Sequence, residues 1–217
     1  MYDNERLTFI HIDMDTLFKK TPLYDLYQQK KFDTHTKIHS QVKGLTKDFI
    51  KSVHYSDAIR LVLIEKYGGF YSDLDMIIIR PLDGFQNVLS CDEGPNVHKG
   101  INVQNLNSDF LGTKVSNAIF HFDKGNVFIK KCLELYESSF DGRWGSGGPN
   151  LFQKVLTHVC NLDYSSQYLS SDKVSPERCQ GIRVLKYKYE IFMLQSTSAH
   201  LLFSSFNMYV TSKWKKH

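Results

Sequence analysis

Residues 56–79 read SDAIRLVLIEKYGGFYSDLDMIII, and this stretch decides the fold. Its first half is rich in apolar residues at helical spacing and ends in Gly68 and Gly69. Because glycine readily adopts the left-handed conformation that ends a helix, the pattern predicts a helix that stops at Gly68. Ser56 is a residue type that caps helices, so we expect the helix to begin there, with Asp57 in its first turn.

The second half of the stretch is typical of β-structure. Residues 70–72 predict one strand, and residues 76–79 predict a second, β-branched strand. Asp73 and Asp75 lie between the two runs. Because residues two apart in an extended chain point to the same side, we expect these two carboxylates to project together.

Four charged side chains of this stretch indicate a ligand site. Asp57 and Arg60 are three residues apart and share one face of the predicted helix. Two carboxylates 4 Å apart repel each other by on the order of 4 kcal/mol, so Asp73 and Asp75 favour a bound hard divalent cation. Such a cation leaves positions open for phosphate oxygens, which the guanidinium of Arg60 also binds. Taken separately, an Asp-x-Asp sequence is often a chance match and a helical Asp-Arg pair is usually a surface ion pair.

Outside this stretch, predicted strands and helices alternate along the chain, which indicates an α/β fold. The predicted elements are a strand at 7–12, a helix after Pro22, an exposed connection or frayed helix at 28–47, a strand at 118–122, a helix from Asn126 to about Phe140 and a helix with an apolar face at 151–159.

Composition excludes several classes of protein. The chain has 217 residues, of which 41% are hydrophobic and 23% charged, so it can bury a core and is not disordered. A net charge of +4 is too mild to indicate a nucleic-acid partner. We find no apolar run that suits a membrane span. The four cysteines contain no Cys-x-x-Cys pair, so structural zinc is not expected, and their even number fits disulfides or buried thiols equally well.

The order of the charged and glycine residues is more informative than any of them alone. Ser56-Asp57-x-x-Arg60 precedes Tyr67-Gly68-Gly69-x-Tyr71 and Asp73-x-Asp75. In this order the chain resembles the α1,4-glycosyltransferase family with a sugar-binding DXD motif. Further similar segments are Asp15-Thr16-Leu17-Phe18 with Thr21-Pro22-Leu23, residues 117–122, Trp144 with residues 148–151, and Cys160 with residues 179–181.

The resemblance implies a GT-A fold, which is a Rossmann-like nucleotide-sugar-binding α/β domain, here truncated at its N-terminus. It places a partial catalytic domain at residues 7–185 and a divergent C-terminal tail at 186–217. The implied reaction moves galactose or an N-acetylhexosamine from a UDP-sugar to a glycolipid or glycan acceptor, in α1,4 linkage, with retention and with Mn²⁺ as the cofactor. No nucleophilic residue is implied, because same-face attack guided by the leaving diphosphate needs none.

The resemblance also implies roles for particular residues. Trp144 either stacks on an acceptor sugar or covers the core. The implied donor-binding residues are Asp57, Arg60, Gly68, Gly69, Tyr71, Asp73 and Asp75; the metal ligands are Asp73 and Asp75; the acceptor-side residues are Asn117, Trp144, Gly148 and Pro149; and the disulfide joins Cys160 to Cys179.

The same resemblance predicts a lumenal Golgi location for a longer, membrane-anchored parent protein. The family's upstream anchor and first strand and helix have no counterpart here, and its downstream His-x-Trp-Asn-Lys stretch has none either. We therefore expect the chain to be a fragment of such a protein.

Two alternatives remain at this stage. A haloacid-dehalogenase-type phosphatase is suggested by Asp13 and Asp15, which follow an apolar run, although Thr16 stands one position too early for that motif. The second alternative is a non-catalytic glycosyltransferase remnant that keeps the fold and binds a sugar or a partner.

Overall fold

A computed structural model of the chain describes residues 10–34, 46–73, 76–78, 84–92, 110–112, 114–162, 169–170, 173–185, 191–193 and 209–211. Its helices are α1 (Met14–Phe18), α2 (Tyr24–Gln28), the 3₁₀ helix η2 (Lys31–Asp33), α3 (Lys47–Tyr67), α4 (Val127–Ser139) and α5 (Pro149–Val159). Its strands are β1 (Gly69–Ser72), β2 (Met76–Ile78), β3 (Val88–Asp92), β4 (Phe110–Gly112), β5 (Lys114–Phe122), β6 (Leu169–Ser170), β7 (Arg183–Val184), β8 (Ile191–Met193) and β9 (Tyr209–Thr211). The predicted α/β class is confirmed.

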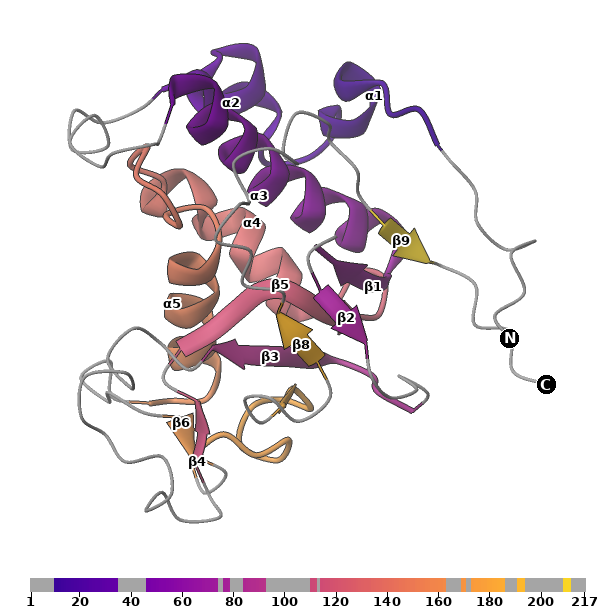
Figure 1. The fold of residues 1–217 in the computed structure, drawn as a ribbon, viewed down its shortest axis with the longest axis vertical. Helices are drawn as coiled ribbons and strands as arrows, with labels where there is room; N and C mark the ends of the chain where they lie inside the picture. The colour runs from indigo at the N-terminus through magenta and orange to yellow at the C-terminus, as the bar shows by residue number, and fades with distance from the viewer. Residues whose placement is uncertain are drawn as a thin grey trace.

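The main sheet has five strands in the order β7-β3-β5-β1-β9, with β5 in the middle. In the described part of this sheet only β3 and β7 pair in parallel, and the other neighbours are antiparallel. The sheet is therefore mixed, whereas a Rossmann-like sheet is mainly parallel, and the GT-A fold stays a prediction. Helices α3, α4 and α5 pack on one another, with α3 against β1 and β5 and α5 against β5 (Figure 1).

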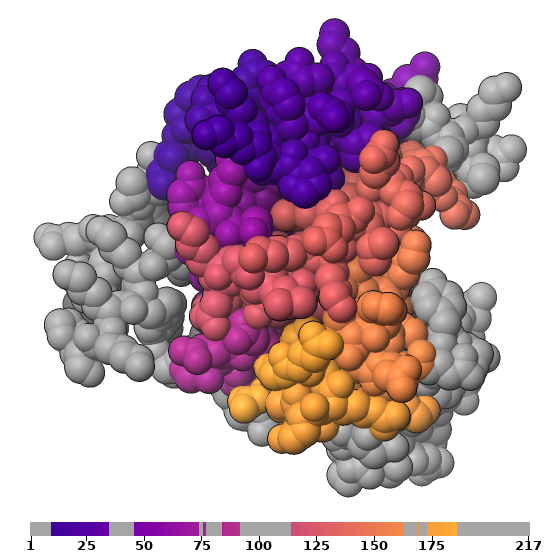
Figure 2. All heavy atoms as spheres, turned by 180° about the vertical axis from the view of Figure 1, so that it is seen from behind, coloured from indigo at the N-terminus to yellow at the C-terminus, as the bar shows by residue number. Residues whose placement is uncertain are grey.

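The N-terminal helices cover the far side of α3. Figure 2 shows residues 10–34 above α4 on this face, and residues 173–185 at its lower edge beside α5. The side chains of Phe18, Leu23 and Phe32 are fully buried there. Phe32 lies in the segment predicted to be exposed, and that prediction is wrong for this residue, because a single apolar residue without periodic neighbours gives no signal of burial. Residues 35–45 of that segment lie outside the described residues.

Helix α3 begins nine residues before the predicted start. It starts at Lys47, where the side chain of Thr46 accepts a hydrogen bond of 3.2 Å from the backbone N–H of Phe49. The prediction that Ser56 caps the helix and that Asp57 lies in its first turn is therefore wrong. Capping tendency is a local signal, whereas Ile50 is buried in tertiary contacts, and these contacts extend the helix backwards.

The predicted end of this helix at Gly68 is confirmed. Gly68 has φ 68° and ψ −173°, a backbone region that is essentially restricted to glycine. A Cβ atom at Gly68 would lie 2.6 Å from the backbone nitrogen of Lys124. The chain then enters β1, where Gly69 stands opposite Phe122 of β5. This close crossing sets the register of β1 on β5.

Several other sequence predictions are confirmed by the structure. The two strands at 70–72 and 76–79 correspond to β1 and β2, and Asn126 caps α4 by accepting a 2.8 Å hydrogen bond from Phe128 N–H. The strand predicted at 118–122 is β5, which begins four residues earlier. Residues 10–12 form no strand, and residues 7–9 lie outside the described residues.

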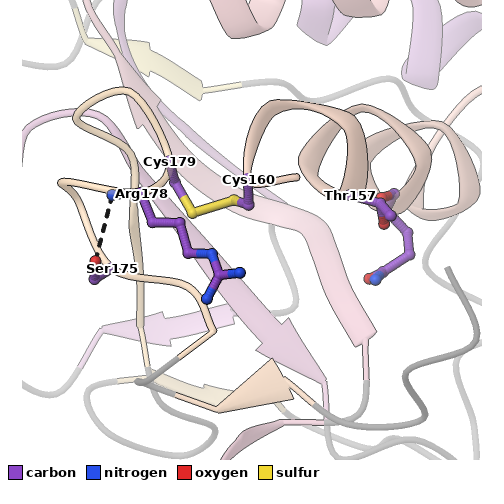
Figure 3. The surroundings of a disulfide bond; sticks show 6 residues. Thr157, Cys160, Ser175, Arg178 and Cys179 are labelled. Atoms are coloured by element: carbon purple, nitrogen blue, oxygen red, sulfur yellow. Dashed lines mark hydrogen bonds between the residues drawn. A yellow bond between two sulfur atoms is a disulfide. The ribbon is translucent and has the colours of Figure 1, made fainter. Parts of the chain in front are cut away.

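A disulfide between Cys160 and Cys179 joins the end of α5 to the turn at 175–182 (Figure 3). It is the pair that the family resemblance implies. The turn is also held by Ser175, whose hydroxyl accepts a 3.4 Å hydrogen bond from the backbone of Arg178. Cys91 and Cys132 are both buried as thiols. In the described ranges, no helix has the length and apolar character needed to cross a bilayer.

We predict that Gly68→Ala destabilises the fold much more than Gly84→Ala. Both glycines have positive φ, 68° and 82°, so each substitution costs about 1–2 kcal/mol of backbone strain. Only Gly68 also lies against backbone atoms, whereas no atom lies within 4 Å of a Cβ at Gly84. Urea unfolding of the two variants measures the difference, and equal losses of unfolding free energy would contradict the role of this crossing.

Candidate functional site

The guanidinium of Arg60 lies at the centre of the candidate site. It comes from the middle of α3 and is 5% exposed. Nη1 donates a 2.6 Å hydrogen bond to the backbone oxygen of Asn117 on β5, and Nη2 donates one of 2.8 Å to the hydroxyl of Ser56. The guanidinium also lies 4.5 Å from the ring centre of Tyr71 on β1. These contacts hold its donors in one orientation.

Two carboxylates flank this guanidinium. Asp57 Oδ1 lies 3.4 Å from Arg60 Nη2, and Asp73 Oδ1 lies 3.3 Å from Nη1. The side-chain amide of Asn117 donates a 2.8 Å hydrogen bond to Asp57, and the hydroxyl of Tyr71 donates one to Asp73. We call Asp57, Arg60, Asp73 and Asn117 the Arg60 cluster. The prediction that Asp57 and Arg60 share a helical face is confirmed, and their burial excludes a surface ion pair.

The backbone holds Asp73 at the edge of this cluster. Asp73 follows β1 directly, and its N–H donates a 2.7 Å hydrogen bond to the carbonyl of Ala118, which continues the pairing of β1 with β5. Its side chain is 32% exposed, whereas that of Asp57 is 4% exposed. One carboxylate of the cluster is therefore enclosed, and the other can be reached from solvent.

The cluster carries an excess of negative charge. Burial raises the pKa of Asp57, although Arg60 and the hydrogen bond from Asn117 oppose this rise. Burial would lower the pKa of Arg60, but Tyr71 and the two carboxylates outweigh burial, so this pKa lies above its ordinary value. Two carboxylates face one guanidinium, and the site therefore favours a positively charged ligand or a ligand with hydroxyl donors.

A glycine loop closes over the enclosed side of the cluster. A Cβ atom on Gly148 would lie 2.7 Å from both carboxylate oxygens of Asp57 and 2.5 Å from the amide nitrogen of Asn117. Gly148 comes directly before Pro149, the first residue of α5, so the start of this helix holds the end of the loop in place. Asp57 Oδ2 has no hydrogen-bond partner among the described residues. Two surface hollows of about 480 and 470 Å³ are lined by residues outside the cluster.

The other predicted site residues lie in different places. Gly69 begins β1, four residues or about 13 Å of extended chain before Asp73, and Gly68 lies one residue further back. The structure therefore does not bring them to the cluster, and Gly68 instead lies against the backbone of Lys124. Asp75 lies outside the described residues.

The residues predicted on the acceptor side separate into two groups. Asn117 is 8% exposed and belongs to the Arg60 cluster through both its backbone oxygen and its amide. Trp144 is 63% exposed on the glycine loop, so it does not cover the core. Gly148 and Pro149 follow Trp144 in the chain, where the loop meets α5.

Two residues of the site were missed by sequence reasoning. Ser56, taken as a helix cap, is inside α3 and accepts two hydrogen bonds from Arg60, one through its hydroxyl and one of 3.2 Å through its backbone oxygen. Tyr136 of α4 is fully buried next to Gly147 of the loop. The apolar spacing of α4 places Tyr136 on the buried face of the helix. A buried phenol usually has a hydrogen-bond partner, so its position was the signal that could have indicated a site residue.

The phosphatase hypothesis loses its basis in the structure. Asp13 does not follow a strand in the described residues, because residues 10–12 are irregular. Its carboxylate caps α1, accepting hydrogen bonds from the backbone N–H and the hydroxyl of Thr16. The hydrogen bonds from Thr16 lower the pKa of Asp13, as expected for an exposed helix cap.

The residues present fit a divalent cation at the exposed edge of the cluster. Asp73 offers a hard oxygen ligand that solvent can reach, next to an uncompensated negative charge. The described residues contain no group of three or more His, Cys, Asp or Glu side chains arranged for a metal. Any further protein ligand would come from outside the described ranges, and Asp75 is such a residue.

Two family models match the chain. Residues 4–93 match the family model described as the glycosyltransferase sugar-binding region containing a DXD motif, and residues 121–216 match the α1,4-glycosyltransferase conserved region. The second match includes most of the segment 186–217, which the sequence analysis sets apart as a tail. No solved structure matches significantly.

Curated relatives are similar over most of this chain. Human α-1,4-N-acetylglucosaminyltransferase is 29% identical over 176 residues, which cover 80% of this chain and 40% of the relative. Human lactosylceramide 4-α-galactosyltransferase is 28% identical over 152 residues, which cover 70% of this chain and 34% of the relative. The mouse form of the latter is also 28% identical over 152 residues. The chain thus spans about a third to two fifths of these relatives.

The predicted resemblance to the α1,4-glycosyltransferase family with a sugar-binding DXD motif is therefore confirmed by both family models and by the relatives.

We predict that Arg60→Met lowers the free energy of unfolding by about 3 kcal/mol at pH 8 and by less at pH 5. The variant leaves Asp57 buried without its cation, so its folded-state pKa rises further above the ordinary 3.8. A raised carboxyl pKa adds stability below the unfolded-state value, and this stability is lost as pH rises through the folded-state value. The deficit therefore grows from pH 5 to pH 8 in urea unfolding.

The matched control is Lys51→Met. Lys51 pairs at 2.8 Å with Asp33 on the surface, and its hydrogen bond lowers the pKa of that carboxyl. A lowered pKa adds stability above the unfolded-state value, so any deficit in this variant is already complete at pH 5 and does not grow to pH 8. The same pH dependence in both variants would contradict the buried role of Arg60.

Proposed function

We propose that this chain is the donor-binding part of a retaining hexosyltransferase, which moves galactose or an N-acetylhexosamine from a UDP-sugar to a glycolipid or glycan in α1,4 linkage. The observation that carries the proposal is the Arg60 cluster, in which α3, β5 and the end of β1 bring a fixed guanidinium, an amide and two carboxylates together. The printed names of the relatives, an N-acetylglucosaminyltransferase and a galactosyltransferase, support the reaction class and leave two hexoses open.

The enclosed half of the cluster suits the donor sugar. Asp57 accepts hydrogen bonds from sugar hydroxyls, and its free oxygen Oδ2 is available for one. Arg60 orients Asp57 through the ion pair of 3.4 Å between them. The amide of Asn117 donates to Oδ1 of Asp57, so that Oδ2 is the oxygen left to accept a hydrogen bond from a sugar hydroxyl. Asn117 therefore acts as a positioning residue on the donor side.

The exposed half of the cluster suits the diphosphate. Asp73 and Asp75 would hold Mn²⁺ together with the diphosphate oxygens of the donor. When bound, this cation supplies Lewis-acid stabilisation of the charge on the departing nucleoside diphosphate. Tyr71 keeps Asp73 Oδ1 engaged, which leaves the second oxygen of Asp73 for the cation.

The exposed loop beside the cluster suits the acceptor. Trp144 presents an exposed aromatic face, on which a sugar ring can stack, near Gly148 and Pro149. The disulfide between Cys160 and Cys179 fits an oxidising compartment such as the Golgi lumen, where a longer, anchored parent protein would meet its glycolipid or glycan.

Calorimetric titration with UDP-galactose and UDP-N-acetylglucosamine, with and without Mn²⁺, tests this function. We expect binding that depends on Mn²⁺ and weakens about tenfold or more when Asp73→Asn and Asp75→Asn are combined, because charge-assisted contacts to the cation are lost. A folded chain that binds neither nucleotide sugar nor UDP would instead identify the non-catalytic remnant.

The chain offers a control with the same spacing. Asp13 and Asp15 form a second Asp-x-Asp sequence on the surface, and asparagine replaces aspartate well as a helix cap. Asp13→Asn combined with Asp15→Asn should leave the binding of both nucleotide sugars unchanged. Loss of binding in this control, with binding kept in the Asp73 and Asp75 double variant, would exclude the proposed site.

A further inference from the structure

We propose that Tyr136 is a further specificity-determining residue, whose hydroxyl donates a hydrogen bond to the hexose of the donor beside Asp57. This inference deepens the proposed function and rests on it, since it requires a donor sugar at the Arg60 cluster. Tyr136 lies on α4, outside the motifs that the sequence analysis assigns to the donor.

The phenol of Tyr136 is buried and lacks a partner. Its side chain is fully enclosed, and its ring stacks on Phe140 and meets Phe32 edge to face. Its hydroxyl oxygen has no hydrogen-bond partner among the described residues. A buried hydroxyl without a partner costs about 1–3 kcal/mol, so its presence at this position calls for a ligand.

The second buried oxygen without a partner among the described residues is Asp57 Oδ2, which lies against Gly148 of the glycine loop. A Cβ atom on Gly147 would clash with the hydroxyl of Tyr136, and one on Gly148 would lie 2.7 Å from Asp57 Oδ2. Two consecutive glycines thus cover two buried polar atoms, neither of which is satisfied within the described structure. The two atoms come from different helices, α4 and α3, and both lie beneath this loop.

The two groups are chemically complementary to a sugar. Burial raises the pKa of Tyr136 well above its ordinary value, and Asp57 raises it further while Arg60 opposes this, so the phenol keeps its proton at neutral pH. It can therefore donate a hydrogen bond, whereas the carboxylate of Asp57 can only accept one. A sugar hydroxyl both accepts and donates, and adjacent hydroxyls on a hexose ring do so in neighbouring directions.

Access to this pair requires the glycine loop to move. Gly147 and Gly148 fill the space beside the two oxygens, so a hexose reaches them only when the loop has shifted away from α4. Backbone hydrogen bonds of the loop run within it and to the start of α5: Ser146 N–H to the Arg143 oxygen, and Gly148 N–H and Asn150 N–H to the Gly145 oxygen. They can persist while the loop moves as a unit.

Tyr136→Phe tests the inference, because it removes one oxygen and keeps the packed ring. Titrations in the presence of Mn²⁺ use UDP-galactose, UDP-N-acetylglucosamine and UDP. The quantity compared is the affinity gained from the hexose, which is the ratio of the affinity for a UDP-hexose to the affinity for UDP. We expect the variant to bind the preferred UDP-hexose about fivefold more weakly and to bind UDP unchanged, as the loss of one hydrogen bond predicts. Its free energy of unfolding should not fall, because the removed hydroxyl has no partner in the unliganded chain.

Tyr55→Phe is the matched control. The hydroxyl of Tyr55 donates a 3.0 Å hydrogen bond to Asp33 on the other side of α3. Burial and this carboxylate raise the pKa of Tyr55 to about 12. This variant should lose stability and keep the affinity gained from the hexose. We thus expect Tyr55→Phe to lower the stability alone and Tyr136→Phe to lower the affinity for the hexose alone.

Each other outcome decides one of the two proposals. If the wild-type chain prefers a UDP-hexose to UDP and Tyr136→Phe keeps that preference, the role of Tyr136 is wrong and the donor site stands. If the wild-type chain binds every UDP-hexose no more tightly than UDP, the donor-sugar site itself is wrong, and the role of Tyr136 is wrong with it.

Discussion

The burial of one guanidinium is the constraint on which the rest of the structure depends. Arg60 projects from α3 and binds the backbone of β5 through the carbonyl of Asn117, while Asp57 and Asp73 balance its charge from α3 and the end of β1. An arginine buried at this depth is tolerated only with nearly all its donors paired. The helix, the two strands and Asp73 therefore have to meet in one arrangement.

The same cluster has been left incomplete. Among the described residues, Asp57 Oδ2 and the hydroxyl of Tyr136 have no hydrogen-bond partner, and the covering residues Gly147 and Gly148 have no side chains to supply one. Such groups lower the stability of the unliganded chain, and under the proposed function a polyhydroxylated ligand would satisfy them. The nearby disulfide between Cys160 and Cys179 holds the far end of α5 in place.

Sequence reasoning succeeded where the physical cause was local. The stop at Gly68, the cap at Asn126 and the two short strands around Asp73 follow from backbone preferences of single residues, and the structure confirms them. It failed where packing at a distance overrides such preferences. Ser56 has the chemistry of a helix cap, but contacts of residues 47–55 extend α3 past it, and Phe32 is buried by helices that its own segment does not reveal.

The sequence by itself determined the kind of chemistry. Asp57, Arg60 and the Asp-x-Asp motif, in their order along the chain, resemble the sugar-binding region of the α1,4-glycosyltransferase family, and the spacing of three on a helix predicts that Asp57 and Arg60 point together. Only the tertiary structure decided which residues complete the site. Asn117, Tyr136 and Gly148 come from β5, α4 and the loop before α5, and no local rule connects positions so far apart in the chain. They meet because the burial of apolar faces sets how the helices lie on the sheet.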